Sequence, residues 1–168
     1  MYRTTLFSNI HRKSKMSDLD TALIDAIRAA SRKMVRELGF MRTTLAGTEY
    51  SPSAVHAMME IGTRQSLTAA ELAEFLNLEK STISRMVRKL IEAGELKETV
   101  SRGDARAKLL SLTPRGKRTV AAIHAFGRQQ VTNALAKLSL EQQQAVVAGL
   151  TAYAQALEDH RVDMPKAP

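Results

Sequence analysis

The sequence predicts a mainly α-helical fold that carries one small antiparallel β element. Apolar residues recur at steps of three and four near both ends of the chain, which is typical of amphipathic helices. Between these ends, residues 68–116 contain a short capped helix, a tight turn, a basic helix and two strands joined by a loop. This order is the layout of a winged helix-turn-helix, flanked here by N- and C-terminal helices.

The predicted helix nearest the N-terminus is long and amphipathic. Its apolar stripe consists of Leu23, Ile27, Ala30, Met34, Leu38, Met41 and Leu45. We expect this helix to stop near Gly47. A second helix then begins with Ser51 as its N-cap and Pro52 at its first position, and it extends to Gly62.

Two shorter helices follow and are separated by a turn. Thr68 and Glu71 have the spacing of a capping box, which places the start of the first helix here. Residues 76–78 are a turn-length break, and Gly94 is expected to end the second helix as its C-cap. The apolar face of that second helix consists of Ile83, Met86, Val87, Leu90 and Ile91.

The predicted wing joins two antiparallel strands, residues 96–100 and 109–112, through the eight residues between them. Thr113 and Pro114 then provide the N-cap and first position of a long helix. Its apolar stripe is Val120, Ile123, Gly127, Val131, Leu135 and Leu138. Ser139 and Gln142 can cap a last helix, whose stripe is Val146, Leu150, Tyr153 and Leu157.

Positive charge is concentrated on the predicted winged module. Residues 79–118 hold eleven Lys or Arg against five Asp or Glu, a net charge of +6, whereas the whole chain carries +8. The other 128 residues therefore contribute only +2. Basic charge gathered on a helix and a ribbon is the electrostatic footprint expected of DNA binding, although a basic run is often only a solvated face.

Composition excludes several classes of protein. The chain has no cysteine, which excludes disulfides, thiol-based redox sensing and cysteine metal sites within it. No apolar run approaches the roughly 18 residues of a membrane span. We therefore expect a soluble, cytoplasmic protein with no membrane partner. Residues 1–16 are expected to be a flexible extension, and residues 161–168 a tail or the start of a linker.

The terminal helices carry apolar stripes that a winged domain of this size cannot fully cover. We expect the N- and C-terminal helices of two chains to interleave in a homodimer, which would place two recognition helices on one face. Dimeric helix-turn-helix proteins contact half-sites about 34 to 36 Å apart, so the DNA partner is expected to be a pseudo-palindromic operator. The alternative is a monomer whose long helices fold back on the winged domain.

Several short motifs occur in the order found in one family. They are Ser51-Pro52, Leu72-Ala73, Ser81-Thr82-Ile83-Ser84-Arg85, Asp104-x-Arg106-Ala107 and Leu112-Thr113-Pro114-x-Gly116. In this order the chain resembles MarR-family transcriptional regulators over residues 17–160. The resemblance implies a DNA-binding winged helix-turn-helix at about 51–116 and dimerisation helices at about 17–46 and 114–160.

The resemblance places the start of the second short helix in the DNA major groove. The residues concerned are Lys80, Ser81, Thr82, Ser84 and Arg85. Ser and Thr can serve base edges or phosphates, and Arg85 suits the O6 and N7 atoms of guanine. Arg88 and Lys89 lie further along and are expected at phosphates. The alternative for Ser81 and Thr82 is simple capping of the helix end near Glu79.

In the wing, Arg106 is similar to the family arginine that enters the minor groove. Asp104 is expected to orient Arg106 or brace the loop, and Arg102 and Lys108 to contact phosphate. The alternative is that Asp104 and Arg106 form only a structural bridge within the wing.

Family resemblance also implies a site for a small aromatic or amphipathic effector between the dimerisation helices and the winged module. The candidate lining residues are Met34, Met41, His56, Met58 and Met59. Because a methionine stripe at helical spacing is more often core, these residues have a structural alternative.

The sequence therefore predicts a double-stranded-DNA-binding regulator, a homodimeric repressor modulated by a small molecule. It contains no nucleophile elbow, phosphate loop or dinucleotide fingerprint, so no enzyme activity, catalytic residue or cofactor is expected. The histidines show no metal-ligand spacing, and no metal site is expected. The alternatives are a winged-helix protein-interaction module, or the regulator half of a fusion to an acetyltransferase.

Overall fold

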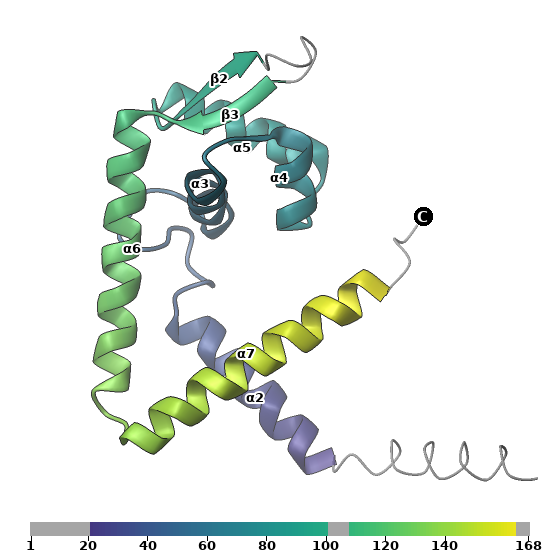
Figure 1. Ribbon diagram of the computed structural model, residues 1–168, viewed down its shortest axis with the longest axis vertical. Helices are drawn as coiled ribbons and strands as arrows, with labels where there is room; N and C mark the ends of the chain where they lie inside the picture. The colour runs from purple at the N-terminus through teal and green to yellow at the C-terminus, as the bar shows by residue number, and fades with distance from the viewer. Residues whose placement is uncertain (1–20, 101–107, 164–168) are drawn as a thin grey trace, which may run out of the picture.

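The computed structural model describes residues 21–100 and 108–163 of the chain. Its elements are α2 (Thr21–Glu37), α3 (Pro52–Arg64), β1 (Leu67–Thr68), α4 (Ala69–Leu76), α5 (Lys80–Glu92), β2 (Leu96–Val100), β3 (Lys108–Leu112), α6 (Pro114–Leu135) and α7 (Leu140–Asp163). Helices α3, α4 and α5 and the strands form one lobe, and α6 runs from this lobe toward α7 and α2 (Figure 1). The predicted architecture, mainly α with a small antiparallel sheet in a winged helix-turn-helix, is confirmed.

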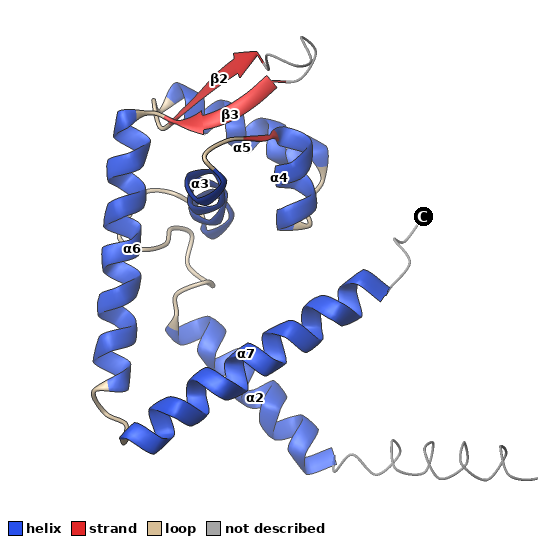
Figure 2. Ribbon diagram, viewed as in Figure 1, coloured by secondary structure: helices blue, strands red, loops and turns tan. Residues whose placement is uncertain are grey.

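The sheet lies at one end of the lobe, above the helices in the view of Figure 2. Its order is β1-β3-β2, and both pairings are antiparallel. β3 begins one residue earlier than predicted, because Lys108 pairs with Val100. The two-residue strand β1 was not predicted, and it pairs Leu67 with Leu110.

Helix α2 ends about ten residues before the predicted end near Gly47, at Glu37. Gly39 has a φ of +86°, a left-handed conformation that a right-handed helix cannot continue. The amide of Gly39 donates to the carbonyl of Arg36 (3.0 Å), and that of Phe40 donates to the carbonyl of Val35 (3.1 Å), the two bonds of a Schellman motif. The apolar pattern continues past this motif because the following loop still packs on the lobe.

The predicted helix starts are confirmed at three side-chain caps. Ser51 accepts from the amide of Ala54 (3.4 Å), and Thr113 accepts from the amide of Gly116 (3.1 Å). Thr68 forms the predicted capping box, in which its backbone amide donates to the Glu71 carboxylate (2.7 Å). Each bond satisfies a backbone donor that the first helical turn leaves unpaired.

The hydrophobic core lies entirely within the lobe and the first half of α6. Its members are Ala54, Val55, Ala57, Met58, Ile61, Leu67, Leu72, Ala73, Ile83, Val87, Leu90, Leu96, Leu110, Leu112, Val120 and Ile123. Helix α2 contributes no buried residue, and the predicted stripe of α7 is exposed throughout. The core therefore fixes the winged module and leaves the terminal helices with open apolar faces.

Candidate DNA interface and the cleft beneath it

Helix α5 presents one apolar face to the core and one polar face to solvent. Ile83, Val87 and Leu90 are buried. The opposite face carries the exposed residues Lys80, Ser81, Ser84, Arg85, Arg88 and Lys89 and the half-buried Thr82. The turn before α5 is fixed because Asn77 adopts a left-handed conformation, with its amide donating to the carbonyl of Glu74 (3.2 Å) and the amide of Leu78 donating to that of Ala73 (3.1 Å), and α5 contacts α4. A helix anchored in this way can present a fixed row of donors to a groove.

The position at which α5 begins shows whether Ser81 and Thr82 cap the helix. The N-cap is Glu79, which makes no side-chain capping bond, and the helix begins at Lys80. Ser81 and Thr82 therefore lie inside the first turn and do not cap it. The Ser84 hydroxyl donates to the carbonyl of Lys80 (2.9 Å), and the Arg85 Nε donates to the carbonyl of Ser81 (3.3 Å).

The wing is only partly within the described residues. Lys108 lies at the base of the wing on β3, and its Nζ is 3.1 Å from the Glu98 carboxylate of β2. Both side chains are exposed, so this ion pair adds little stability and leaves Lys108 accessible to another anion. Arg102, Asp104 and Arg106 lie outside the described residues.

A buried acid, Glu95, stands between α5 and β2. Its Oε1 accepts hydrogen bonds from the Tyr50 hydroxyl (2.8 Å) and from Nε of Arg115 (3.0 Å). Burial, followed by the hydrogen bond to Glu95, raises the pKa of Tyr50, and the same acceptor raises the pKa of Arg115. These three residues form no motif in the sequence, because Glu95 lies 45 positions from Tyr50 and 20 positions from Arg115.

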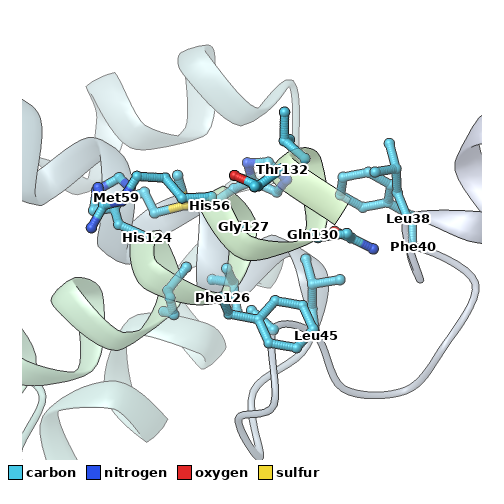
Figure 3. Close-up of a pocket in the computed structure, with 15 residues that line it drawn as sticks. Leu38, Phe40, Leu45, His56, Met59, His124, Phe126, Gly127, Gln130 and Thr132 are labelled. Carbon is cyan, nitrogen blue, oxygen red and sulfur yellow. The ribbon is translucent and has the colours of Figure 1, made fainter. Parts of the chain in front are cut away.

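A cleft of about 510 Å³ lies between α3, α6 and the loop that follows α2. Its lining is mainly apolar and includes Leu38, Phe40, Leu45, Val55, Met59, Ile123, Phe126 and Val131, with His56, His124, Arg128, Gln130 and Thr132 as polar members. The rings of Phe40 and His56 are stacked, with centroids 5.6 Å apart and planes 19° apart. Figure 3 shows side chains from the three segments converging on this hollow.

The cleft includes two of the five residues that the sequence analysis proposed for an effector site. His56 and Met59 line it. Met58 is fully buried in the core, one position along the same helix, and Met34 and Met41 are exposed residues outside the lining. His124, Phe126 and Arg128 were missed because their side chains join the site only when α6 packs beside α3. An aromatic residue and two basic groups at helical spacing on residues 124–128 were the available signal.

Within residues 21–100 and 108–163, no cluster of three His, Cys, Asp or Glu residues is arranged to hold a metal ion. In the same part of the chain, no helix is long and apolar enough to cross a membrane.

Comparisons with known proteins agree with this architecture. Residues 50–108 match the MarR family. YfiV of Bacillus subtilis (strain 168), an uncharacterized HTH-type transcriptional regulator, is 25% identical over 111 residues, which are 66% of this chain and 69% of that protein. Among solved structures, Streptococcus pneumoniae FabT in complex with DNA is 23% identical with a TM-score of 0.69, covering 83% of this chain and 99% of FabT.

A second similar structure is that of a protein whose DNA binding is regulated by a small molecule. Bordetella bronchiseptica BpsR, whose DNA binding is regulated by 6-hydroxynicotinic acid, is 15% identical with a TM-score of 0.61. The match covers 77% of this chain and 98% of BpsR. At this identity the likeness shows the fold alone. With the family match over the winged module, the related regulator and the shared fold, this chain is similar to the MarR family of winged helix-turn-helix transcriptional regulators.

Proposed function

We propose that the protein is a homodimeric repressor that binds a pseudo-palindromic operator and releases it when a small molecule occupies the cleft. The observation that carries the DNA-binding part is the polar face of α5. Four cations, Lys80, Arg85, Arg88 and Lys89, are exposed there while the opposite face is anchored in the core. Arg85 and the hydroxyl residues near it would contact base edges, and the later cations would contact phosphates.

The wing would extend this contact into the neighbouring minor groove. Lys108 lies at its base, and the basic sequence around Arg106 comes directly before Lys108 in the chain. A minor groove that is narrow concentrates negative potential and attracts arginine. Arg102 and Lys108 would contact phosphate on either side, with Asp104 restraining Arg106.

Dimerisation is proposed from the open apolar faces of the terminal helices. The exposed large apolar residues on α2 and α7 are Leu23, Ile24, Ile27, Met34, Val35, Leu140, Val146, Val147, Leu150, Tyr153 and Leu157. Large apolar residues left exposed in such number are typical of an interface. A second copy would cover these faces and set two α5 helices about one DNA turn apart, near 34 Å. In this proposal residues 17–46 and 114–160 form the dimerisation region.

The cleft supports the ligand-dependent part of the proposal. It combines an apolar lining with Arg128 and two histidines, which suits a small aromatic acid. Its walls include α6, which joins the dimerisation region to the winged module. A ligand that wedges these walls apart would change the spacing of the two α5 helices, and the similar protein BpsR is regulated by an aromatic acid.

A binding titration tests the DNA-binding part. The full chain is titrated into a duplex from its own upstream region and into a scrambled duplex at two salt concentrations, and the mass of the complex is measured. We expect preferential binding, two chains per duplex, and an affinity that falls roughly a thousandfold between about 50 and 200 mM salt, because several phosphate contacts release counterions. Equal weak binding to both duplexes with no salt dependence would contradict the proposal.

A matched pair of variants identifies the binding face. Arg85→Ala should weaken operator binding by at least tenfold. Lys137→Ala removes the same charge at the far end of α6, in the turn before α7, and should leave affinity within about twofold, because an exposed charge far from the duplex is screened. Equal losses in the two variants would indicate only a general charge effect.

A further inference from the structure

The junction between α5 and the wing contains an acid whose burial calls for an explanation. Glu95 is 1% exposed and follows Gly94, which ends α5 in a left-handed conformation with a φ of +73°. Its Oε1 has two donors, but Oε2 is buried and has no hydrogen-bond partner among the described residues. Removing a charge from water is unfavourable unless its partners compensate fully, and here one oxygen is uncompensated.

Three segments meet at Glu95. Tyr50 comes from the loop before α3, Glu95 from the link between α5 and β2, and Arg115 from the first turn of α6. Backbone bonds reinforce the same junction, since the amide of Thr113 donates to the carbonyl of Glu95 (3.0 Å) and its hydroxyl donates to the carbonyl of Gly94 (2.6 Å). The end of the recognition helix and the root of the wing are thus tied to α6 at one point.

The partners of Glu95 also belong to segments that form the cleft. Tyr50 closes the loop after α2 through a hydrogen bond from the amide of Leu45 to its carbonyl (2.9 Å), and Leu45 and Ala46 line the cleft. Arg115 begins α6, which supplies the facing wall from Ile123 onward. Two of the three segments that form the cleft, the loop after α2 and α6, are therefore linked to the same carboxylate.

Stability alone does not account for this arrangement. Glu95 is buried whereas its partner Arg115 is largely exposed, so the acid loses hydration that the ion pair does not fully restore. Replacing a buried charged group and its partner by apolar residues of similar volume is often neutral or stabilising, because this desolvation is avoided. Apolar packing, however, does not fix direction, whereas a carboxylate oxygen that accepts from two donors restrains the angle between the segments that supply them. We therefore look for the role of Glu95 in the angle between these segments, which apolar packing alone would not fix.

We propose that Glu95 is a positioning residue that sets the recognition helix and the wing root at a fixed angle to α6 and to the loop after α2, two of the three segments that form the cleft, and so determines operator specificity. This inference rests on the proposed DNA-binding function. It assigns to Glu95 no contact with DNA. Its effect reaches DNA through α5, which ends at Glu92 shortly before it, and through β2, which begins at Leu96 immediately after it.

The test separates stability from specificity in the full chain. The double variant Glu95→Leu with Tyr50→Phe replaces the buried acid and its half-buried tyrosine partner by apolar groups of similar size. Wild-type protein first selects a preferred duplex from a random-sequence pool. Thermal unfolding is then measured for both proteins, together with their affinities for the selected duplex and for a scrambled one.

We expect the double variant to unfold at or above the wild-type temperature, yet to bind the selected duplex at least tenfold more weakly, about 1.4 kcal/mol. Its affinity for the scrambled duplex should stay within twofold, because the phosphate-contacting cations are unchanged. A stable double variant with the wild-type ratio of affinities would overturn the inference. Failure of the wild type to enrich any duplex would overturn the proposed function instead, and the inference with it.

A milder variant keeps the test decisive if the double variant does not fold. Tyr50→Phe removes one hydrogen-bond donor to Glu95 and leaves the ring in place. It should lower the ratio of selected to scrambled affinity about threefold with helix content unchanged. A ratio equal to that of the wild type in this folded variant would likewise reject a positioning role.

Discussion

The close approach of α6 to the carbonyl of Glu95 at Gly116 predicts that two alanine substitutions in the same helix act in opposite directions. A Cβ added at Gly116, in the first turn of α6, would lie 2.2 Å from the carbonyl oxygen of Glu95 and 3.1 Å from Leu112 Cδ2. A Cβ added at Gly127, three turns further along, meets no heavy atom of the described residues within 4 Å. Gly116→Ala should therefore destabilise the protein, and Gly127→Ala should stabilise it.

The magnitudes follow from the contacts. The Glu95 carbonyl must move by about 1 Å, which places the strain near the upper end for overpacking, about 3 kcal/mol. That movement disrupts its bond from the Thr113 amide, about 1 kcal/mol, and the helix propensity of alanine offsets about 1 kcal/mol. The net loss for Gly116→Ala is about 3 kcal/mol, whereas Gly127→Ala gains about 0.5 to 1 kcal/mol from propensity alone.

Thermal unfolding followed by circular dichroism measures both effects. For a chain of this size, the melting temperature should fall by about 6 to 12 °C for Gly116→Ala and rise by about 1 to 4 °C for Gly127→Ala. Both variants and the wild type are compared at one protein concentration, because association shifts the midpoint. If Gly116→Ala melted within about 2 °C of Gly127→Ala, the close approach of α6 to the α5–β2 link would be refuted.

Three further predictions concern the wing, a helix cap and the pH dependence of stability. Arg106→Ala should weaken operator binding by more than about tenfold while dimer mass and helix content stay unchanged, and fluorescence anisotropy with an unaltered affinity would remove the wing from the mechanism. Thr68→Ala should lower the free energy of unfolding by about 1 kcal/mol in urea titrations, because the capping box is lost, and no change would mean that the cap is dispensable. The pKa of Tyr50 is raised in the folded state from 10.0, so its contribution is present below pH 10 and is lost as the pH rises through the folded value. Wild-type stability should therefore fall more steeply above about pH 10 than that of Tyr50→Phe, and parallel curves would show that Tyr50 is not coupled to folding.

Local signals in the sequence were sufficient for most helix starts, because a cap depends on residues only three positions apart. The end of α2 was wrong for a related reason: apolar spacing continues through Leu38 and Leu45, and it outweighed the single glycine at 39 that stops the helix. Strand β1 was missed because two residues are too few to show alternation, and its pairing with β3 is a long-range contact.

The candidate site shows the same division between local and distant information. The polar face of α5 could be predicted because one helix carries all of it. The cleft could not, because its walls come from a loop, α3 and α6, and because one helical position separates the buried Met58 from the cleft-lining Met59. The Tyr50–Glu95–Arg115 cluster was missed because nothing near Glu95 in the sequence indicates a buried acid.

The buried core residues of the described structure all lie between Ala54 and Ile123. The backbone amides should therefore fall into two groups that differ in what slows their hydrogen exchange. Amides in α3, α5 and β3 lie in the core and should exchange only when the winged module unfolds globally. Amides of α2 and α7 have no buried side chains of their own chain to protect them, so their exchange should slow as protein concentration rises and copies associate. The concentration dependence of deuterium uptake along one polypeptide would thus map which helices owe their order to a second chain.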